Sequence, residues 1–130
     1  MAGSVDETQE WLRRARDALG AGSLLLDRGY FLVSVSRAYY AMFYAAKAAV
    51  VSEGLEAIKH STVISVFGQH FAKTGRVPGS LHKSLRIAFD ERQLADYTLD
   101  WTVSREAAQT RLAEAEHFVS AISALLVSPP

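Results

Sequence analysis

The spacing of the apolar residues constrains this chain most, because it repeats with the period of an α-helix along nearly the whole length. The clearest run follows Ser104 and consists of Ala108, Leu112, Ala115, Val119, Ile122 and Leu126. A half-buried strand would need an apolar residue at every second position, and no stretch keeps that alternation for long. We therefore predict an all-α protein whose helices pack as a bundle.

Cap residues and glycines divide this pattern into five helices. Ser4 and Glu7 form a capping-box pattern at the start of the first helix, and Gly29 is a typical residue for its end. Gly20 and Gly22 should weaken this helix in the middle. The remaining helices are expected at 30–53, at 61–74, from Ser80 onward with that serine as N-cap, and from Ser104 onward.

Length and composition indicate one domain that spans residues 1–130. The chain has no cysteine, which excludes disulfides and thiolate metal sites. It also lacks a signal-type N-terminus and an apolar run of membrane-spanning length, so we expect a cytoplasmic protein with no membrane partner. Its 14 basic and 14 acidic side chains cancel, so no broad electrostatic attraction to nucleic acid is predicted.

The second predicted helix carries two stripes at helical spacing. One stripe is small, which lets a neighbouring helix approach closely, and it consists of Ala38, Ala41, Ala45 and Ala48. The other stripe is basic and aromatic: Arg37, Tyr40, Tyr44 and Lys47. Because guanidinium groups bind phosphate and rings stack on bases, Arg37, Tyr40 and Lys47 are candidate ligand-binding residues. Packing in the core or between subunits is an equally open interpretation of the rings.

The fourth predicted helix has an arginine at the end of its apolar stripe, which is formed by Leu81, Leu85 and Ala88. An isolated charge in such a position is costly, so Arg92 must be paired or must face a cleft. Asp96 lies one turn further on and can pair with it, and the phenol of Tyr97 follows. Arg92, Asp96 and Tyr97 are therefore the candidate catalytic residues. The alternative is an ion pair that clamps the fourth helix to the second.

A metal site is the other chemistry that the spacing raises. Glu114 and His117 have the i, i+3 spacing of carboxylate-bridged di-iron bundles. Such a site needs two of these motifs, and only one is present, so a solvated charged patch is the preferred interpretation. No glycine-rich phosphate loop occurs either. We expect no metal and no cofactor.

Three segments together resemble one family. They are the stretches 36–44 (SRAYYAMFY), 59–67 (KHSTVISVF) with 70–78 (HFAKTGRVP), and 92–97 (RQLADY). Their residues, order and spacing are similar to those of a small prokaryotic HEPN family. The resemblance implies an up-and-down four-helix bundle with a short additional helix, and a symmetric homodimer. It also implies a role beside a minimal nucleotidyltransferase in a toxin–antitoxin pair, in which the HEPN member is a metal-independent RNase.

The RNase members carry an arginine followed four to six residues later by a histidine. Arg92 matches the arginine, whereas Asp96, Tyr97 and Thr98 occupy the positions where the histidine would stand. His60 and His70 lie elsewhere in the chain, and no sequence feature brings either of them to Arg92.

The leading interpretation is therefore a HEPN binding module for RNA, a nucleotide or a partner nucleotidyltransferase. Its expected cleft is lined by Arg37, Tyr40, Lys47, Arg92 and Tyr97. The alternatives are an RNase with an unusual site built from Arg92, Asp96 and Tyr97, and a purely structural partner subunit.

Overall fold

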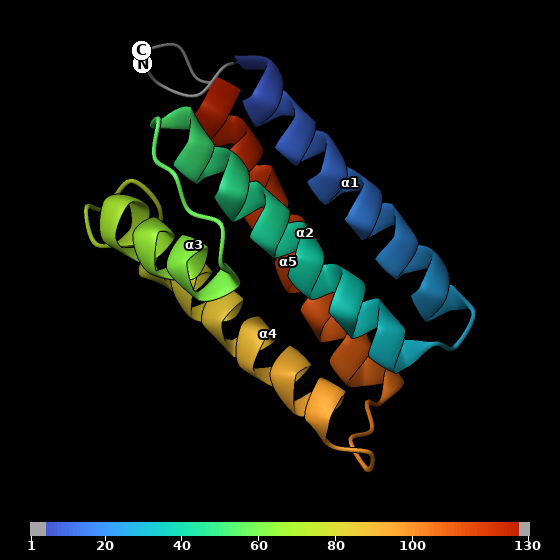
Figure 1. Ribbon diagram of the computed structural model, residues 1–130. Helices are drawn as coiled ribbons and strands as arrows, with labels where there is room; N and C mark the ends of the chain where they lie inside the picture. Colours follow the sequence, from blue (N-terminus) through green and yellow to red (C-terminus); the bar gives the residue numbers. More distant parts are fainter. Residues whose placement is uncertain (1–4, 128–130) are drawn as a thin grey trace.

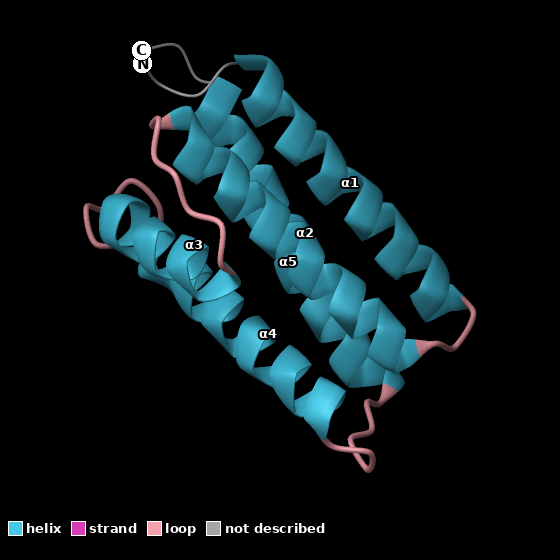
Figure 2. Ribbon diagram, viewed as in Figure 1, coloured by secondary structure: helices cyan, strands magenta, loops and turns pink. Residues whose placement is uncertain are grey.

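The computed structural model describes residues 5–127 of the chain. Its elements are α1 (Val5–Asp27), α2 (Phe31–Ser52), α3 (His60–Phe67), the π-helical turn η1 (Gly68–Ala72), α4 (Gly79–Tyr97) and α5 (Arg105–Val127). The four long helices run alternately up and down, and α3 lies beside α2 and α4 (Figure 1). The described residues contain helices and loops only (Figure 2). The predicted all-α fold with a short additional helix is confirmed.

Helix α2 lies at the centre and contacts α1, α3, α4 and α5. Its predicted small stripe is buried throughout: Ala38, Ala41, Ala45 and Ala48 are at most 1% exposed. Because alanine side chains are short, the axes of neighbouring helices can come close to α2. This central position decides which of its residues remain for a site.

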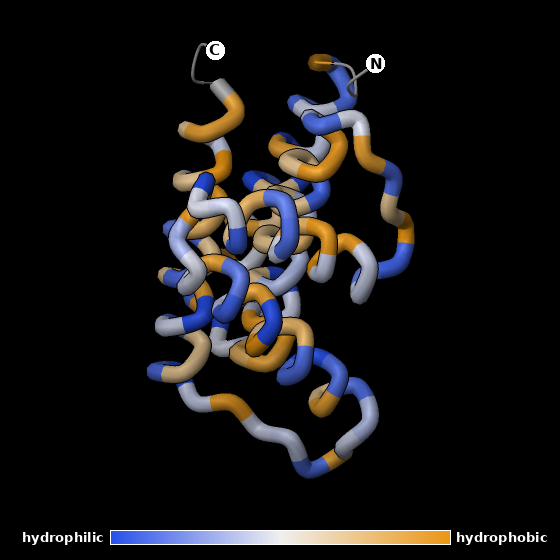
Figure 3. Tube along the Cα trace, turned by 90° about the vertical axis from the view of Figure 1, so that its left-hand side faces the viewer, coloured by the Kyte–Doolittle hydropathy of each residue, from blue (hydrophilic) through white to orange (hydrophobic). Residues whose placement is uncertain are grey.

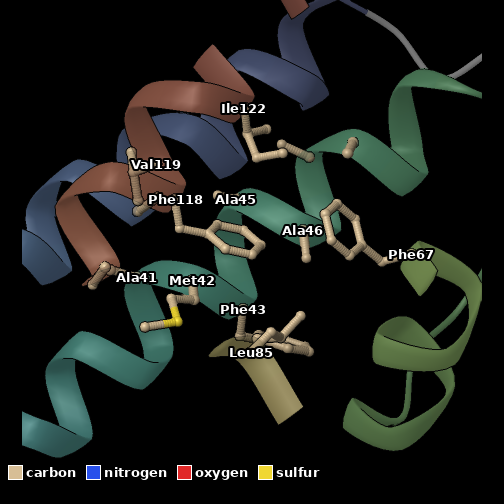
Figure 4. Close-up of a cluster of buried hydrophobic side chains, with 14 of the residues drawn as sticks. Ala41, Met42, Phe43, Ala45, Ala46, Phe67, Leu85, Phe118, Val119 and Ile122 are labelled. Carbon is tan, nitrogen blue, oxygen red and sulfur yellow. The ribbon is translucent and has the colours of Figure 1, made fainter. Parts of the chain in front are cut away.

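The core forms where α2 meets α5, α3 and α4. Phe118 of α5 and Phe67 of α3 point toward the alanines of α2, and Leu85 of α4 lies beside Phe43 (Figure 4). The ring centroids of Phe67 and Phe118 are 5.4 Å apart. Polar and apolar residues alternate along the helices (Figure 3), as expected for amphipathic helices with one buried side. The apolar residues that repeat at helical spacing in the sequence therefore form the observed core.

The helix ends match the cap predictions in part. At the end of α1, Gly29 has a positive φ of 84°, and the amides of Gly29 and Tyr30 donate to the carbonyls of Leu26 and Leu25. This pattern is the Schellman motif that glycine favours. The Oγ of Ser104 accepts from the amide of Ala107 at 3.1 Å, so the predicted cap of α5 is confirmed.

Two other cap predictions have a different outcome. Ser80 lies inside the first turn of α4, and Pro78 occupies the N-cap position, so the prediction for Ser80 is wrong. Proline lacks an amide hydrogen and is confined to φ near −65°, and with the extended backbone at Pro78 the helix begins two residues earlier than predicted. Ser4 lies outside the described residues.

Gly22 has a packing role that the sequence did not indicate. Helix α1 continues without interruption through Gly20 and Gly22. The carbonyl of Gly22 accepts a buried hydrogen bond of 2.7 Å from the Oγ of Ser34, and a Cβ at Gly22 would lie 3.1 Å from Leu112. The expected weak point is therefore a place where α1 meets α2 and α5 closely.

The helix predicted at 61–74 is observed as α3 followed by the single π-helical turn η1. At this turn the ring of His82 lies against Gly68, and a Cβ at Gly68 would be 2.5 Å from Nε2 of His82. His82 also forms a hydrogen bond with the backbone of Ile64, and within residues 5–127 its buried Nε2 has no hydrogen-bond partner. Burial lowers the pKa of His82, so the ring is neutral near pH 7.

Substituting Gly68→Ala tests this close contact. The new methyl group would have to displace the His82 ring, which is held by its backbone bond, so we expect a loss of about 1–3 kcal/mol in the free energy of unfolding. Gly20→Ala is the matched control, since a Cβ there meets nothing within 4 Å and should stabilise α1 by about 0.5–1 kcal/mol. Chemical denaturation measures both, and equal stabilisation of the two variants would contradict the contact.

Candidate functional site

Arg92 of α4 lies against the surface of α2. Leu81, Leu85 and Ala88 are buried on the inner side of α4, and Arg92 continues that side one turn beyond them. Its guanidinium carbon lies 4.9 Å from the ring centroid of Tyr40 and 5.8 Å from that of Tyr39. The charge at the end of the apolar stripe therefore rests on two aromatic rings, which attract a cation through their electron-rich faces.

Besides the two rings, the positive charge of the Arg92 guanidinium has one weak partner, the carboxylate of Asp96. Nη1 lies 3.3 Å from Oδ2 of Asp96, whose side chain is 50% exposed. Nε is buried and has no hydrogen-bond partner among the residues that the structure describes. A single long contact to a half-exposed carboxylate is a weak ion pair, because water screens it. The predicted pairing of Arg92 with Asp96 is present, but it lies within α4 and does not clamp α4 to α2.

Arg111 of α5 shows how a structural arginine differs. Its Nε lies 2.7 and 3.1 Å from the two carboxylate oxygens of Glu91 on α4, and its Nη1 lies 2.7 Å from Glu114. These bonds raise the pKa of the Arg111 guanidinium, and the Glu91 bond has the largest effect. Arg111 is thus the ion-pair clamp between two helices. Arg92, by contrast, retains donors and charge for a ligand.

His60, the first residue of α3, lies on the same pair of tyrosines. Its ring centroid is 5.8 Å from those of both Tyr39 and Tyr40, and its ring stacks on Phe43 at 4.0 Å with an interplanar angle of 18°. Nδ1 of His60 and the hydroxyl of Tyr39 are 2.6 Å apart. Burial and the nearby positive charge of Arg92 both lower the pKa of His60, so its neutral form dominates near pH 7.

The hydrogen bond between Tyr39 and His60 fixes the tautomer of the imidazole. Burial raises the pKa of Tyr39, which keeps its hydroxyl protonated, and within residues 5–127 that hydroxyl has no other acceptor. Tyr39 must therefore donate to Nδ1, because its hydrogen would otherwise be buried without a partner. The proton of neutral His60 then lies on Nε2, which is not among the buried unpaired atoms. His60 offers a hydrogen-bond donor, and in this tautomer it offers no base.

Arg37 also lies against Tyr40 and completes the group. Its guanidinium carbon lies 4.7 Å from the Tyr40 ring centroid, and it forms no ion pair with any residue that the structure describes. We call this group the Arg92 cluster; it consists of Arg37, Tyr39, Tyr40, His60, Arg92 and Asp96. It combines two guanidinium groups, an imidazole N–H and a half-buried ring. Such a set can bind a phosphate and stack on a base.

Two predicted site residues lie outside the Arg92 cluster. Lys47 is further along α2, where its Nζ donates to the carbonyl of Ala57 and lies 5.7 Å from the ring centroid of Trp11. Tyr97 is 87% exposed, and within the described residues no hydrogen bond or cation–π contact joins it to Arg92. The structure therefore brings together Arg37, Tyr40, Arg92 and Asp96, and it leaves Lys47 and Tyr97 apart from them.

No sequence feature placed His60 near Arg92, whereas in the structure the two residues are neighbours. His60 and Arg92 are 32 positions apart in the chain, and only the packing of α3 and α4 against α2 makes them neighbours. His70 is exposed and lies in η1. The sequence signal that could have pointed to His60 was the adjacent pair Tyr39–Tyr40, because two neighbouring rings on one helix can contact side chains from two other elements.

The sequence contains one possible metal-binding pair, Glu114 and His117, where a di-iron site would need two such pairs. Glu114 forms an ion pair with Arg111, and His117 is exposed. Within residues 5–127, no group of three or more histidine and carboxylate side chains is arranged to hold a metal ion. In the same range no helix is long and apolar enough to cross a membrane.

Comparison with known proteins identifies relatives over most of the chain. Residues 8–125 match the family model of the HEPN domain. A UPF0332 protein of Gloeobacter violaceus is 41% identical over 87% of this chain and 90% of its own length. A UPF0332 protein of Thermotoga maritima is 36% identical over 89% of this chain and 88% of its own. A Methanocaldococcus jannaschii protein that carries the name "Putative toxin" is 33% identical over 93% of this chain and 90% of its own.

The tautomer of His60 can be tested directly by NMR of protein labelled with ¹⁵N in its histidines. We expect the neutral ring to carry its proton on Nε2 and to titrate below the usual histidine pKa of about 6.5. In Tyr39→Phe the donated hydrogen is gone, so both tautomers should become populated. Tyr44→Phe is the control, since its ring has no contact with His60. A neutral wild-type ring protonated on Nδ1 would refute the assignment.

Proposed function

The chain belongs to the HEPN-domain family, and from this membership we propose that it binds RNA through the Arg92 cluster as a module of a toxin–antitoxin-type system. We place it in the cytoplasm. The observation that carries the proposal is the under-neutralised guanidinium of Arg92, which has one 3.3 Å contact to Asp96 where Arg111 has two carboxylates. A phosphate can displace a weak, half-exposed ion pair at little cost.

The composition of the Arg92 cluster favours binding over acid–base chemistry. Arg37, Arg92 and the Nε2–H of His60 are donors, and Asp96 is the one carboxylate among the six residues. The half-buried ring of Tyr40 lies against both guanidinium groups, and its exposed part can stack on an unpaired base. A single nucleotide phosphate presents the same chemistry and is the simplest alternative ligand.

The proposal also includes partners. The family resemblance implies a homodimer and a minimal nucleotidyltransferase, and the toxin names of two relatives are consistent with such a pair. Leu94, Tyr97 and Leu99 are exposed together at the C-terminal end of α4 and beyond it, where a second protein could cover them. Tyr97 would then serve the protein interface instead of the Arg92 cluster.

Removal of Arg92 tests the binding function. We expect Arg92→Ala to weaken the binding of single-stranded RNA about tenfold, because a phosphate contact is lost. The affinity should also depend less steeply on the salt concentration. Arg92→Lys should recover only part of the affinity, since an ammonium cannot form the planar fork. Arg105→Ala is the matched control, because Arg105 also rests on a ring, that of Phe31 at 4.8 Å. Fluorescence anisotropy at several salt concentrations gives the dissociation constants, and equal losses in both alanine variants would count against the site.

An endoribonuclease is the second candidate, and the neighbourhood of His60 and Arg92 favours it. In such a reaction Nε2 of His60 would take the proton of a 2′-hydroxyl as its oxygen attacks the phosphorus, and Arg92 would stabilise the charge on the phosphate. The bond from phosphorus to the 5′-oxygen would break, and that oxygen would leave with a proton from water. The proton transfer to His60 needs an unprotonated Nε2, so the hydrogen bond from Tyr39 must first reverse its direction.

Incubation with RNA separates the two candidates. Metal-independent cleavage that disappears in Arg92→Ala and His60→Gln, and that slows as the pH falls below the pKa of His60, would establish the enzyme. The binding module predicts no cleavage, together with an RNA affinity that rises over the same fall in pH, because protonated His60 adds a positive charge beside the phosphate.

A further inference from the structure

A row of three half-buried rings leads away from the Arg92 cluster across the surface of α2 and α1. The ring centroids of Tyr40 and Tyr44 are 5.7 Å apart, and those of Tyr44 and Trp11 are 5.8 Å apart. Neighbouring rings are tilted by 37° and 33°, so each ring contacts the next one along the row. We call Tyr40, Tyr44 and Trp11 the aromatic row.

Cations lie at both ends of the aromatic row. The guanidinium carbon of Arg14 is 4.9 Å from the ring centroid of Trp11, just as Arg37 and Arg92 lie 4.7 and 4.9 Å from that of Tyr40. Neither Arg14 nor Arg37 forms an ion pair within the described part of the chain. No hydrogen bond to a described residue uses their donors either, so both guanidinium groups can still donate to a phosphate.

The aromatic row also has a defined end. Beyond Trp11, a hollow of about 390 Å³ is lined by Lys47, Glu7 and Glu56 among other residues. Lys47 donates to the carbonyl of Ala57 there. The hollow thus combines one basic and two acidic side chains, whereas the two ends of the aromatic row carry arginines.

We propose that the aromatic row is a binding path for single-stranded RNA that extends from the Arg92 cluster to Trp11. This inference rests on the proposed RNA binding and adds its footprint. Successive bases stack on Tyr40, Tyr44 and Trp11, and the guanidinium groups at the two ends contact the phosphates. Stacking on ring faces does not depend on the identity of the base, so the path selects unpaired RNA without a strict sequence.

Oligoadenylates from the dinucleotide to the hexanucleotide test the path by fluorescence anisotropy. In the wild type the affinity should rise with length and level off once the three rings are occupied. Trp11→Leu should weaken binding of the hexanucleotide about tenfold and leave the dinucleotide unchanged, since the shorter ligand is held at the Arg92 cluster. Trp11→Phe, which keeps a ring, should recover most of the loss. Trp101→Leu is the control, because Trp101 lies in the loop before α5 and away from the aromatic row.

Arg14→Gln provides a second variant in case Trp11→Leu folds poorly. Arg14 is exposed on α1, so its replacement should preserve the fold and selectively weaken the hexanucleotide. Wild-type binding that grows with length but is unchanged in both Trp11→Leu and Arg14→Gln would overturn the path and leave the Arg92 site intact. Absence of any RNA binding would remove both proposals. Stronger binding of a hexaglutamate peptide than of the hexanucleotide would overturn the path in favour of a protein partner.

Discussion

The burial of α2 is the constraint on which the rest of this structure depends. The helix contacts α1, α3, α4 and α5, and its small stripe lets α1 and α5 approach closely. A central helix can present only a narrow strip of its surface to solvent. In this chain that strip carries Arg37, Tyr40, Tyr44 and Lys47, so the position of the polar stripe follows from the requirement to bury the small one.

Tyr39 and Tyr40 are the residues of α2 around which the candidate site forms. Tyr39 is fully buried and Tyr40 is half-buried, and together they receive Arg92 from α4 and His60 from α3. Because the three groups come from three helices, the Arg92 cluster exists only when the bundle is folded. The rings also replace a carboxylate as the main partner of Arg92, which keeps the arginine in place and preserves its charge for a ligand.

The sequence was sufficient for the fold and for four of the six residues of the Arg92 cluster. The helical period and the caps at Gly29 and Ser104 depend on local interactions, so they could be predicted from the chain alone. Arg92 was found for the same reason, since a charge on an apolar stripe is a local anomaly. His60 could not be found, because its approach to Arg92 depends on how α3 folds back against α2. The close contact of Gly68 with His82 likewise needs the tertiary structure.

One hydrogen bond decides how an arginine and a histidine placed together can act. In a nuclease the imidazole must accept a proton, whereas Tyr39 donates to Nδ1 and thereby places the proton on Nε2. Reversing the bond would leave the hydroxyl hydrogen of fully buried Tyr39 without an acceptor, which costs about 1–3 kcal/mol. Ionisation of the phenol is no remedy, because burial raises the pKa of Tyr39. The base-competent tautomer is therefore a minor one, and the same residues that resemble a catalytic pair are suited to holding a phosphate.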